Sequence, residues 1–359
     1  MNWQQVGKVM IGTSLALGAA AAFAQQGPVE TYPQVPVTTD ATAQSVGNFN
    51  YGVCSTFGSD TSCYHNWGVV RASPPKVLLY TRTGGVRQAS LGTPLAAGLN
   101  PPLGADNNTQ KDMIRLLNAQ GIAVDYTEDV HCLTSCAGST GNLNQYAALI
   151  FFSTSEDVLW DNGNAVVPAL AVSGSTTAYL DAGRTALRQY MRAGGGFVGV
   201  NYALGQNADE GISEFSWVTG LLGNANLYDS AGFQNGTIVI QGNDSSTAGV
   251  GGPGTQVAFQ DSWFTLDPFP TKVKFLAAVD ESTLATKKAV HPGHPTFHPV
   301  AWCHYYDGGR AWITSLGTDA SATSDLTTTP SPTVPNRAAF QSMLVNGIKS
   351  AMGMIPFCT

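Results

Sequence analysis

Short apolar runs alternate with amphipathic segments through the first half of the chain. Four runs have the length and composition of buried strands: 76–80, 122–126, 147–152 and 197–200. Segments 110–120 and 184–193 repeat apolar residues at helical spacing. Gly121 and Gly194 stand where these helices are expected to end. This order of strand, helix and strand is typical of a parallel sheet.

The second half continues the pattern with further apolar runs. Expected strands lie at 237–241, 256–259, 273–279 and 311–316, with a short helix at 217–222 and a closing helix at 337–352. The sequence contains no internal repeat. We therefore predict an α/β domain over residues 76–356, in which helices flank a mostly parallel sheet on both faces as a three-layer sandwich.

Polar residues follow three of the expected strands directly, at 81–88, 153–157 and 201–206. In open parallel sheets, ligands bind outside the carboxyl ends of the strands. Asn201 comes directly after the run 197–200. It is therefore the first candidate for a functional side chain.

The N-terminus has the pattern of an export signal. Lys8 is its single charge, residues 9–22 are apolar, and Ala22-Phe23-Ala24 matches an A-x-A cleavage site. The alternative, a membrane anchor, needs about 20 apolar residues, more than this run contains. We expect a cleaved signal peptide over 1–24, a secreted or periplasmic protein, and no membrane attachment after cleavage. Residues 25–75, rich in Pro, Thr, Gln and Asn, are expected to form an extended arm.

Export changes the interpretation of the cysteines. The chain has six, an even number that favours disulfides in an oxidising compartment. Proximity in the sequence favours Cys54–Cys63 and Cys132–Cys136, which leaves Cys303–Cys358. The alternative is a metal or redox site, but the sequence contains no C-x-x-C.

The composition limits the partners. Hydrophobic residues make up 43% of the chain, enough for a sizeable core, and charged residues make up 11%. The formal net charge is −7, and Lys and Arg form no cluster. Nucleic acids and acidic membranes bind to basic surfaces, so neither is an expected partner. The sequence does not indicate an oligomeric state.

Several motifs of known chemistry are missing or incomplete. The sequence lacks the G-x-S-x-G nucleophile elbow and the H-E-x-x-H zinc motif. A G-x-G-x-x-G spacing at 249–254 is followed by a strand-like run instead of the helix of a dinucleotide site, so we expect a flexible loop. Three histidines fall within 291–298, but the prolines between them favour plain loop histidines over a metal site. We expect no metal and no cofactor.

A set of segments in order carries a family resemblance. They are Thr81–Arg87, Asn142–Tyr146, Gly194–Val200, Asp261–Trp263, Val279–Glu281 and His298–Trp302, followed by Gly309-Arg310. Together, over residues 76–353, they resemble the ThuA-like (trehalose utilisation) family. That resemblance implies a fold similar to the class I glutamine amidotransferase domain, and flavodoxin-like in its layers.

The chain departs from the family pattern at several expected site positions. Gln88, Asn201, Asp229 or a neighbour of it, and Thr318 stand where the family usually has histidine, and Ser262 stands where it has glutamate. Amides and hydroxyls can bind the hydroxyl groups of a sugar, but they do not transfer protons near neutral pH as histidine does. These departures therefore predict a site that is poor in titratable groups.

The resemblance implies a small carbohydrate-like ligand. Its expected binding residues are Arg87, Gln88, Asn201, Tyr202, Asp229, Trp263, Trp302 and Thr318. The two tryptophans are candidates for stacking on a sugar ring, with core packing as the alternative. Three hypotheses follow: a binding protein with a degenerate site, an active sugar-processing enzyme in which Asp261 and His298 act as acid and base, and a structural protein that has lost the site.

Overall fold

The computed structural model describes residues 74–134, 143–156, 158–159, 183, 186–205, 215–287, 297–325 and 334–359. The expected signal peptide, nearly all of the arm over 25–75, the pair Cys54–Cys63, and His291 lie outside these residues.

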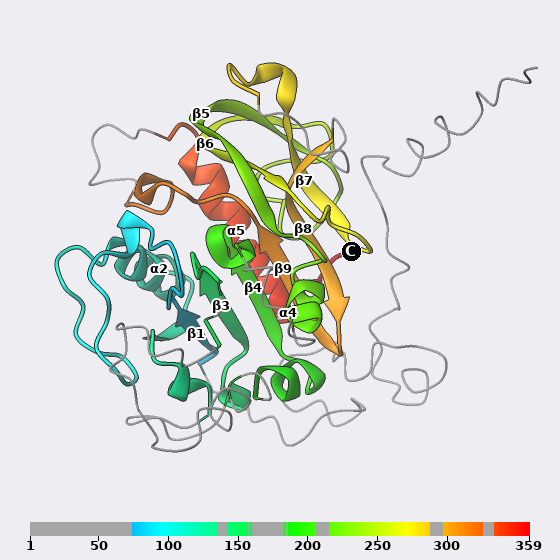
Figure 1. Ribbon diagram of the computed structural model, residues 1–359. Helices are drawn as coiled ribbons and strands as arrows, with labels where there is room; N and C mark the ends of the chain where they lie inside the picture. The colour runs from blue at the N-terminus through cyan, green and yellow to red at the C-terminus, as the bar shows by residue number, and fades with distance from the viewer. Residues whose placement is uncertain are drawn as a thin grey trace, which may run out of the picture.

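The described residues form one nine-stranded sheet in the order β2-β1-β3-β4-β9-β8-β7-β5-β6 (Figure 1). The strands are β1 (Lys76–Tyr80), β2 (Ala123–Thr127), β3 (Ala148–Phe152), β4 (Gly196–Val200), β5 (Leu227–Ile240), β6 (Gln256–Leu266), β7 (Lys274–Asp280), β8 (His298–Tyr306) and β9 (Gly309–Thr314). The expected strands are all present in this sheet.

The five strands from β2 to β9 in this order are parallel. All five residues of β3 and all five of β4 are buried. Such two-sided burial is typical of parallel strands that are covered on both faces, and it explains why these segments read as continuous apolar runs. The carboxyl ends of β3, β4 and β9 consequently meet at one edge of the sheet.

The other half of the sheet corrects the expectation of a mostly parallel fold. β8, β7, β5 and β6 all join their neighbours in antiparallel orientation. Antiparallel strands need only short connections, whereas parallel strands need a long crossover. Asp307 and Gly308, both with positive φ, connect β8 to β9 in a two-residue hairpin turn. The fold is therefore mixed α/β.

Helices cover both faces of the parallel half. α2 (Asn108–Asn118) and α5 (Arg337–Ala351) pack on one face, where Met113, Leu117 and Ile348 join the core of β1, β3 and β4. The helical residues 186–192 and α4 (Phe215–Leu221) pack on the other face, through Leu187, Met191 and Leu221. Burying each such side chain contributes about 1.5–3 kcal/mol to stability. No helix among the described residues has both the length and the apolar character needed to span a membrane.

Short 3-10 helices occupy many of the connections. They are η2 (Ala89–Leu91), η3 (Val130–Leu133), η4 (Leu143–Gln145), η5 (Asn201–Leu204), η7 (Glu281–Thr283) and η8 (Ala320–Ala322). η5 begins directly after β4, so Asn201 is the first residue of this short helix and follows the last residue of the strand.

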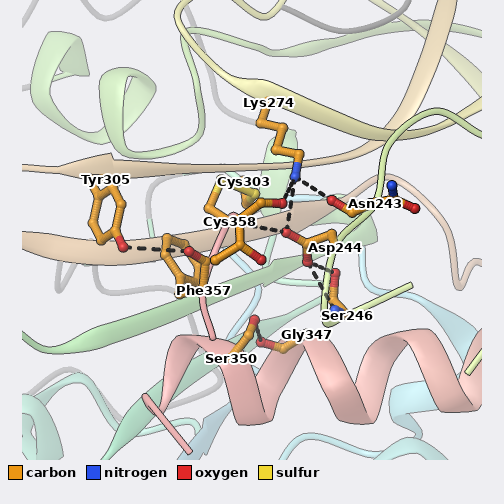
Figure 2. The surroundings of a disulfide bond; sticks show 11 residues. Asn243, Asp244, Ser246, Lys274, Cys303, Tyr305, Gly347, Ser350, Phe357 and Cys358 are labelled. Atoms are coloured by element: carbon orange, nitrogen blue, oxygen red, sulfur yellow. Dashed lines mark hydrogen bonds and ion pairs between the residues drawn. A yellow bond between two sulfur atoms is a disulfide. The ribbon is translucent and has the colours of Figure 1, made fainter. Parts of the chain in front are cut away.

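The expected disulfide Cys303–Cys358 is present and is drawn in Figure 2. It joins β8 to the segment after α5, with the two Cα atoms 5.8 Å apart. Cys132 is also disulfide-bonded, and the described residues do not contain its partner. The pair Cys132–Cys136 therefore stays a prediction, because residue 136 lies outside the described part.

Candidate functional site

Two residues at the carboxyl edge adopt a backbone conformation that side chains rarely take. Ser153, directly after β3, has φ of 50°, and Asn201, directly after β4, has φ of 55°. Asn tolerates this left-handed region because its short side chain can bond locally, whereas most residues lose about 1–2 kcal/mol there. Such outliers cluster at functional sites, which directs attention to this edge.

A chain of side-chain hydrogen bonds crosses the three strand ends. The Asn201 Nδ2 donates to Ser153 Oγ, with 3.3 Å between the two atoms. Thr318 Oγ1, in the loop after β9, donates to Asn201 Oδ1 over 3.3 Å. Ser153 and Asn201 are completely buried, and Thr318 is half-buried. The amide of Asn201 thus links a hidden hydroxyl to one that reaches the surface.

Asp261 enters this edge from β6. Its Oδ2 accepts a hydrogen bond from Gly317 N (2.7 Å), and its Oδ1 accepts from Thr318 N (3.2 Å) and from Ser262 N (2.7 Å). β6 is not a neighbour of β9 in the sheet, so these bonds connect two parts of the sheet that do not pair directly. The Asp261 carboxylate therefore fixes the backbone that presents Thr318.

The environment of Asp261 changes its titration. The residue is 1% exposed, and burial raises the pKa of Asp261 to about 6, although its N–H donors oppose this rise. Tyr202, on η5, is half-buried and packs its ring edge-on against Phe264. Burial raises the pKa of Tyr202, and the negative charge of Asp261 raises it further. The structure thus brings Asn201, Tyr202, Asp261 and Thr318 together.

His298 begins β8 at the same edge but makes other contacts. Its Nε2 donates to the carbonyl oxygen of Phe264 over 2.7 Å, and its Nδ1 lies 3.2 Å from Glu281 Oε1. The imidazole is 2% exposed. Phe264 lies three residues after Asp261 on β6. His298 therefore contacts the stretch of β6 that contains Asp261, but the two expected catalytic residues hydrogen-bond to different partners. Their joint action as acid and base stays a prediction.

Arg87 holds its own loop in place. Its guanidinium donates to both carboxylate oxygens of Glu128, over 2.9 and 3.2 Å, and to the carbonyls of Leu91, Gly92 and Thr93. Glu128 is completely buried, and burial raises the pKa of Glu128 while Arg87 opposes that rise. Because its guanidinium is bonded to these partners, Arg87 stabilises its own loop and is not free to bind a ligand. Glu128 was not among the expected site residues, although it follows β2 at the carboxyl edge.

The two tryptophans lie in the core. Trp263 is 1% exposed and Trp302 is 0% exposed. Their indole N–H groups donate to the carbonyls of Gln234 and Leu222, each over 3.0 Å. Neither ring presents a face on which a sugar could stack, so the core-packing alternative describes both residues.

The remaining expected residues are placed less completely. Gln88 is half-buried at the N-cap of η2 and makes no capping bond with its side chain. The backbone of Asp229 lies in β5, and its side chain is outside the described part of the structure. Among the described residues, no group of three or more His, Cys, Asp or Glu side chains could hold a metal ion.

Comparisons with known proteins give the family. The ThuA family model, described as trehalose utilisation, matches residues 76–329. A ThuA-like protein of known structure from Bacteroides uniformis is 16% identical; the match covers 77% of this chain and 90% of that one, with a TM-score of 0.50. Another from Parabacteroides merdae is 12% identical, over 77% and 90% of the two chains, with a TM-score of 0.44. At such identities the likeness concerns the fold alone.

None of the curated proteins compared matches this chain. The family model covers well over half of the sequence, and its matched residues contain every strand of the sheet. The chain belongs to the ThuA (trehalose utilisation) family.

Proposed function

We propose that the protein binds a carbohydrate-like ligand at the carboxyl edge of β3, β4 and β9. Thr318 and Tyr202, the half-buried members of the site, would contact the ligand. Ser153, Asn201 and Asp261 lie beneath them and act as positioning residues. The observation that carries the proposal is the chain of hydrogen bonds that joins the side chains of Ser153, Asn201 and Thr318. Asp261 completes it by accepting a hydrogen bond from the backbone N–H of Thr318.

The chemistry of these groups supports a neutral ligand with many hydroxyls. A hydroxyl or a phenol both donates and accepts hydrogen bonds, as a sugar hydroxyl does. Arg87, which follows β1, is already bonded to Glu128 and to three carbonyls. Arg87 is therefore not a free positive partner for an anionic ligand. The family description, trehalose utilisation, favours the same class of ligand.

Calorimetric titration with a panel of mono- and disaccharides, including glucose and trehalose, tests this proposal. At least one sugar should bind, and Thr318→Val should weaken it about tenfold, because one hydrogen bond is worth about 1–1.5 kcal/mol. Thr286→Val is the matched control, since Thr286 is exposed and its hydroxyl makes no hydrogen bond within the described residues. If no sugar binds, the complete burial of Ser153 and Asn201 favours a structural protein that has lost the site.

One observation favours a second candidate, an active sugar-processing enzyme. A carboxyl group with a pKa near 6, as at Asp261, can exchange protons near neutral pH. Incubation with the bound sugar, followed by mass spectrometry and NMR of the products, tests this. Turnover that depends on pH around 6 and is lost in Asp261→Asn would support the enzyme. An unchanged sugar would exclude turnover of that ligand.

We also propose that the protein is exported. The bonded state of Cys303, Cys358 and Cys132 supports an oxidising compartment, where structural disulfides persist. N-terminal sequencing of the mature protein should find Gln25 as its first residue. A mature chain that starts at Met1 would contradict signal cleavage.

A further inference from the structure

A cavity lies at the other end of the strands from the candidate site. β5 starts at Leu227, near the candidate site: a Cβ placed on Gly205, which follows β4 and η5, would lie 3.9 Å from the Leu227 side chain. The strand ends at Ile240, at the opposite end of the sheet from the candidate site. The loop after Ile240 and Thr359 line an open cavity of about 480 Å³. Its lining includes Asn243, Asp244, Ser245, Thr247, Gly252 and Thr359.

The charged side chains of Lys274 and Asp244 beside this cavity are fully hydrogen-bonded (Figure 2). Lys274 donates to the carbonyl of Asn243 over 2.6 Å, to Asp244 Oδ2 over 3.5 Å and to the main-chain oxygen of Thr359. Asp244 Oδ1 accepts from the N–H and the hydroxyl of Ser246, and Oδ2 also accepts from Thr359 N. A bound anion would find no free ammonium at Lys274, and a bound cation would find no free carboxylate oxygen at Asp244.

The disulfide Cys303–Cys358 holds one wall of the cavity. Cys358 directly precedes Thr359, and both cysteines are buried. Phe357, the next residue toward the N-terminus, packs edge-on against Tyr305 of β8. Thr359 is therefore fixed by its own bonds and by the two residues before it.

Two neutral side chains of the lining stay open. Within the described residues, the amide of Asn243 and the hydroxyl of Ser245 make no hydrogen bond, and Figure 2 shows the Asn243 side chain pointing away from Lys274. Gly252 contributes only backbone atoms to the lining. It lies beside Asn243, since a Cβ added to Gly252 would lie 3.7 Å from Asn243 Oδ1. Together they offer donors and acceptors without charge.

We propose that this cavity binds a small neutral polyhydroxylated molecule, a cyclic polyol or a single sugar ring. Its volume lies within the range of about 300–1,000 Å³ that is usual for small-molecule sites. The Asn243 amide and the Ser245 hydroxyl bind the hydroxyls of the ligand, and Lys274 with Asp244 keeps the floor rigid. This site is separate from the carboxyl edge and does not depend on it.

Titration of the ¹⁵N-glycine-labelled protein with myo-inositol and with D-glucose, up to about 100 mM, tests the proposal by NMR. The amide signals of Gly251 and Gly252 should shift and saturate. Asn243→Ala should weaken this binding about tenfold, and Gly252→Val, whose side chain fills the cavity at a residue without positive φ, should abolish it. Asn235→Ala, an exposed asparagine on β5, is the matched control and should change the affinity by less than about twofold.

Other outcomes overturn the proposal. The absence of any shift at Gly251 and Gly252 with both compounds excludes the site, and so do shifts that survive both variants. Shifts confined to Gly317 would contradict the cavity site while supporting the carboxyl edge. In Cys303→Ser/Cys358→Ser, binding at the cavity should be lost while the Gly317 signal stays in place as a check of folding. If the double variant still binds the ligand at the cavity, the claim that the disulfide holds one wall of the site is wrong.

Discussion

Asn201 is the residue on which the candidate site depends most. Its left-handed backbone, its complete burial and its two hydrogen bonds all meet at the end of β4. An amide suits this position because it donates to one neighbour and accepts from the other, which a neutral histidine also does but with a charge change near neutral pH. In this chain the position therefore orders neighbours without titrating.

Asp261 is the titrating group of the site, and its raised pKa determines the direction in which stability changes with pH. Burial raises the pKa of Asp261 from 3.8 to about 6 in the folded protein. Between about pH 4 and 6 the folded state then binds more protons than the unfolded state, so stability falls as the pH rises through this window. The full effect is at most about 3 kcal/mol, from about two pKa units.

Asp261→Asn removes that pH dependence. The free energy of unfolding of both proteins is measured with urea at pH 4, 5, 6 and 7. As the pH rises from about 4 to 6, the wild type should lose stability relative to the variant, so that any deficit of the variant becomes smaller. Above about pH 6 the difference between the two should be constant. A difference that is the same at all four pH values would contradict the raised pKa.

The loop clamp formed by Arg87 and Glu128 belongs to the scale of elements. It joins the loop after β1 to the residue after β2 with both oxygens of a completely buried carboxylate. Arg87→Ala leaves that carboxylate without its charge partner, so we expect a loss of about 3–5 kcal/mol in unfolding free energy. Chemical denaturation measures it.

The matched control for this clamp is the double variant Arg87→Ala/Glu128→Gln. It removes the buried charge together with its partner, so it should be more stable than Arg87→Ala alone. An Arg87→Ala protein as stable as wild type would show that the clamp contributes little.

The sequence predicted the parallel half of the sheet better than the antiparallel half. β3 and β4 are apolar on both faces and lie beside helices with clear spacing, so local pattern was sufficient. β8 was not predicted as a strand because Pro299 interrupts it and its first residue belongs to a histidine-rich segment. Pro299 is accommodated where the register between β7 and β8 shifts, a contact that no local pattern encodes.

The candidate site was predicted in part for a similar reason. Asn201 follows a strand directly, so the rule for parallel sheets identified it, whereas Thr318 was identified through the family resemblance. The roles of Arg87, Trp263 and Trp302 depend on partners far along the chain, at Glu128, Gln234 and Leu222. Side-chain type alone did not distinguish a ligand-facing residue from one that is bonded inside the protein.

At the scale of the whole molecule, buried groups give the pH profile two opposing contributions. His304, on β8, donates from Nε2 to the carbonyl of Leu221, the last residue of α4, over 2.9 Å. Burial lowers the pKa of His304 from 6.5 to about 4. The unfolded chain therefore binds a proton that the folded protein excludes, and stability falls as the pH drops from about 6.5 to 4. Asp261 acts in the opposite direction.

His304→Gln retains a donor for Leu221 and removes the titration. Relative to wild type, this variant should become more stable by up to about 3 kcal/mol as the pH falls from 6.5 to 4. Thermal or urea unfolding across this range measures the difference. A wild-type protein and a variant with parallel pH profiles would contradict the neutral state of His304.

The central claim is that Thr318 and Tyr202 present a binding surface for a sugar, supported from below by Asn201 and Asp261. A crystal structure of the complex with the tightest-binding sugar of the panel tests it most directly. We predict a sugar hydroxyl within about 3.2 Å of Thr318 Oγ1 and another at the same distance from the Tyr202 hydroxyl. A sugar bound elsewhere, with both of these oxygens facing only water or protein, would contradict the claim.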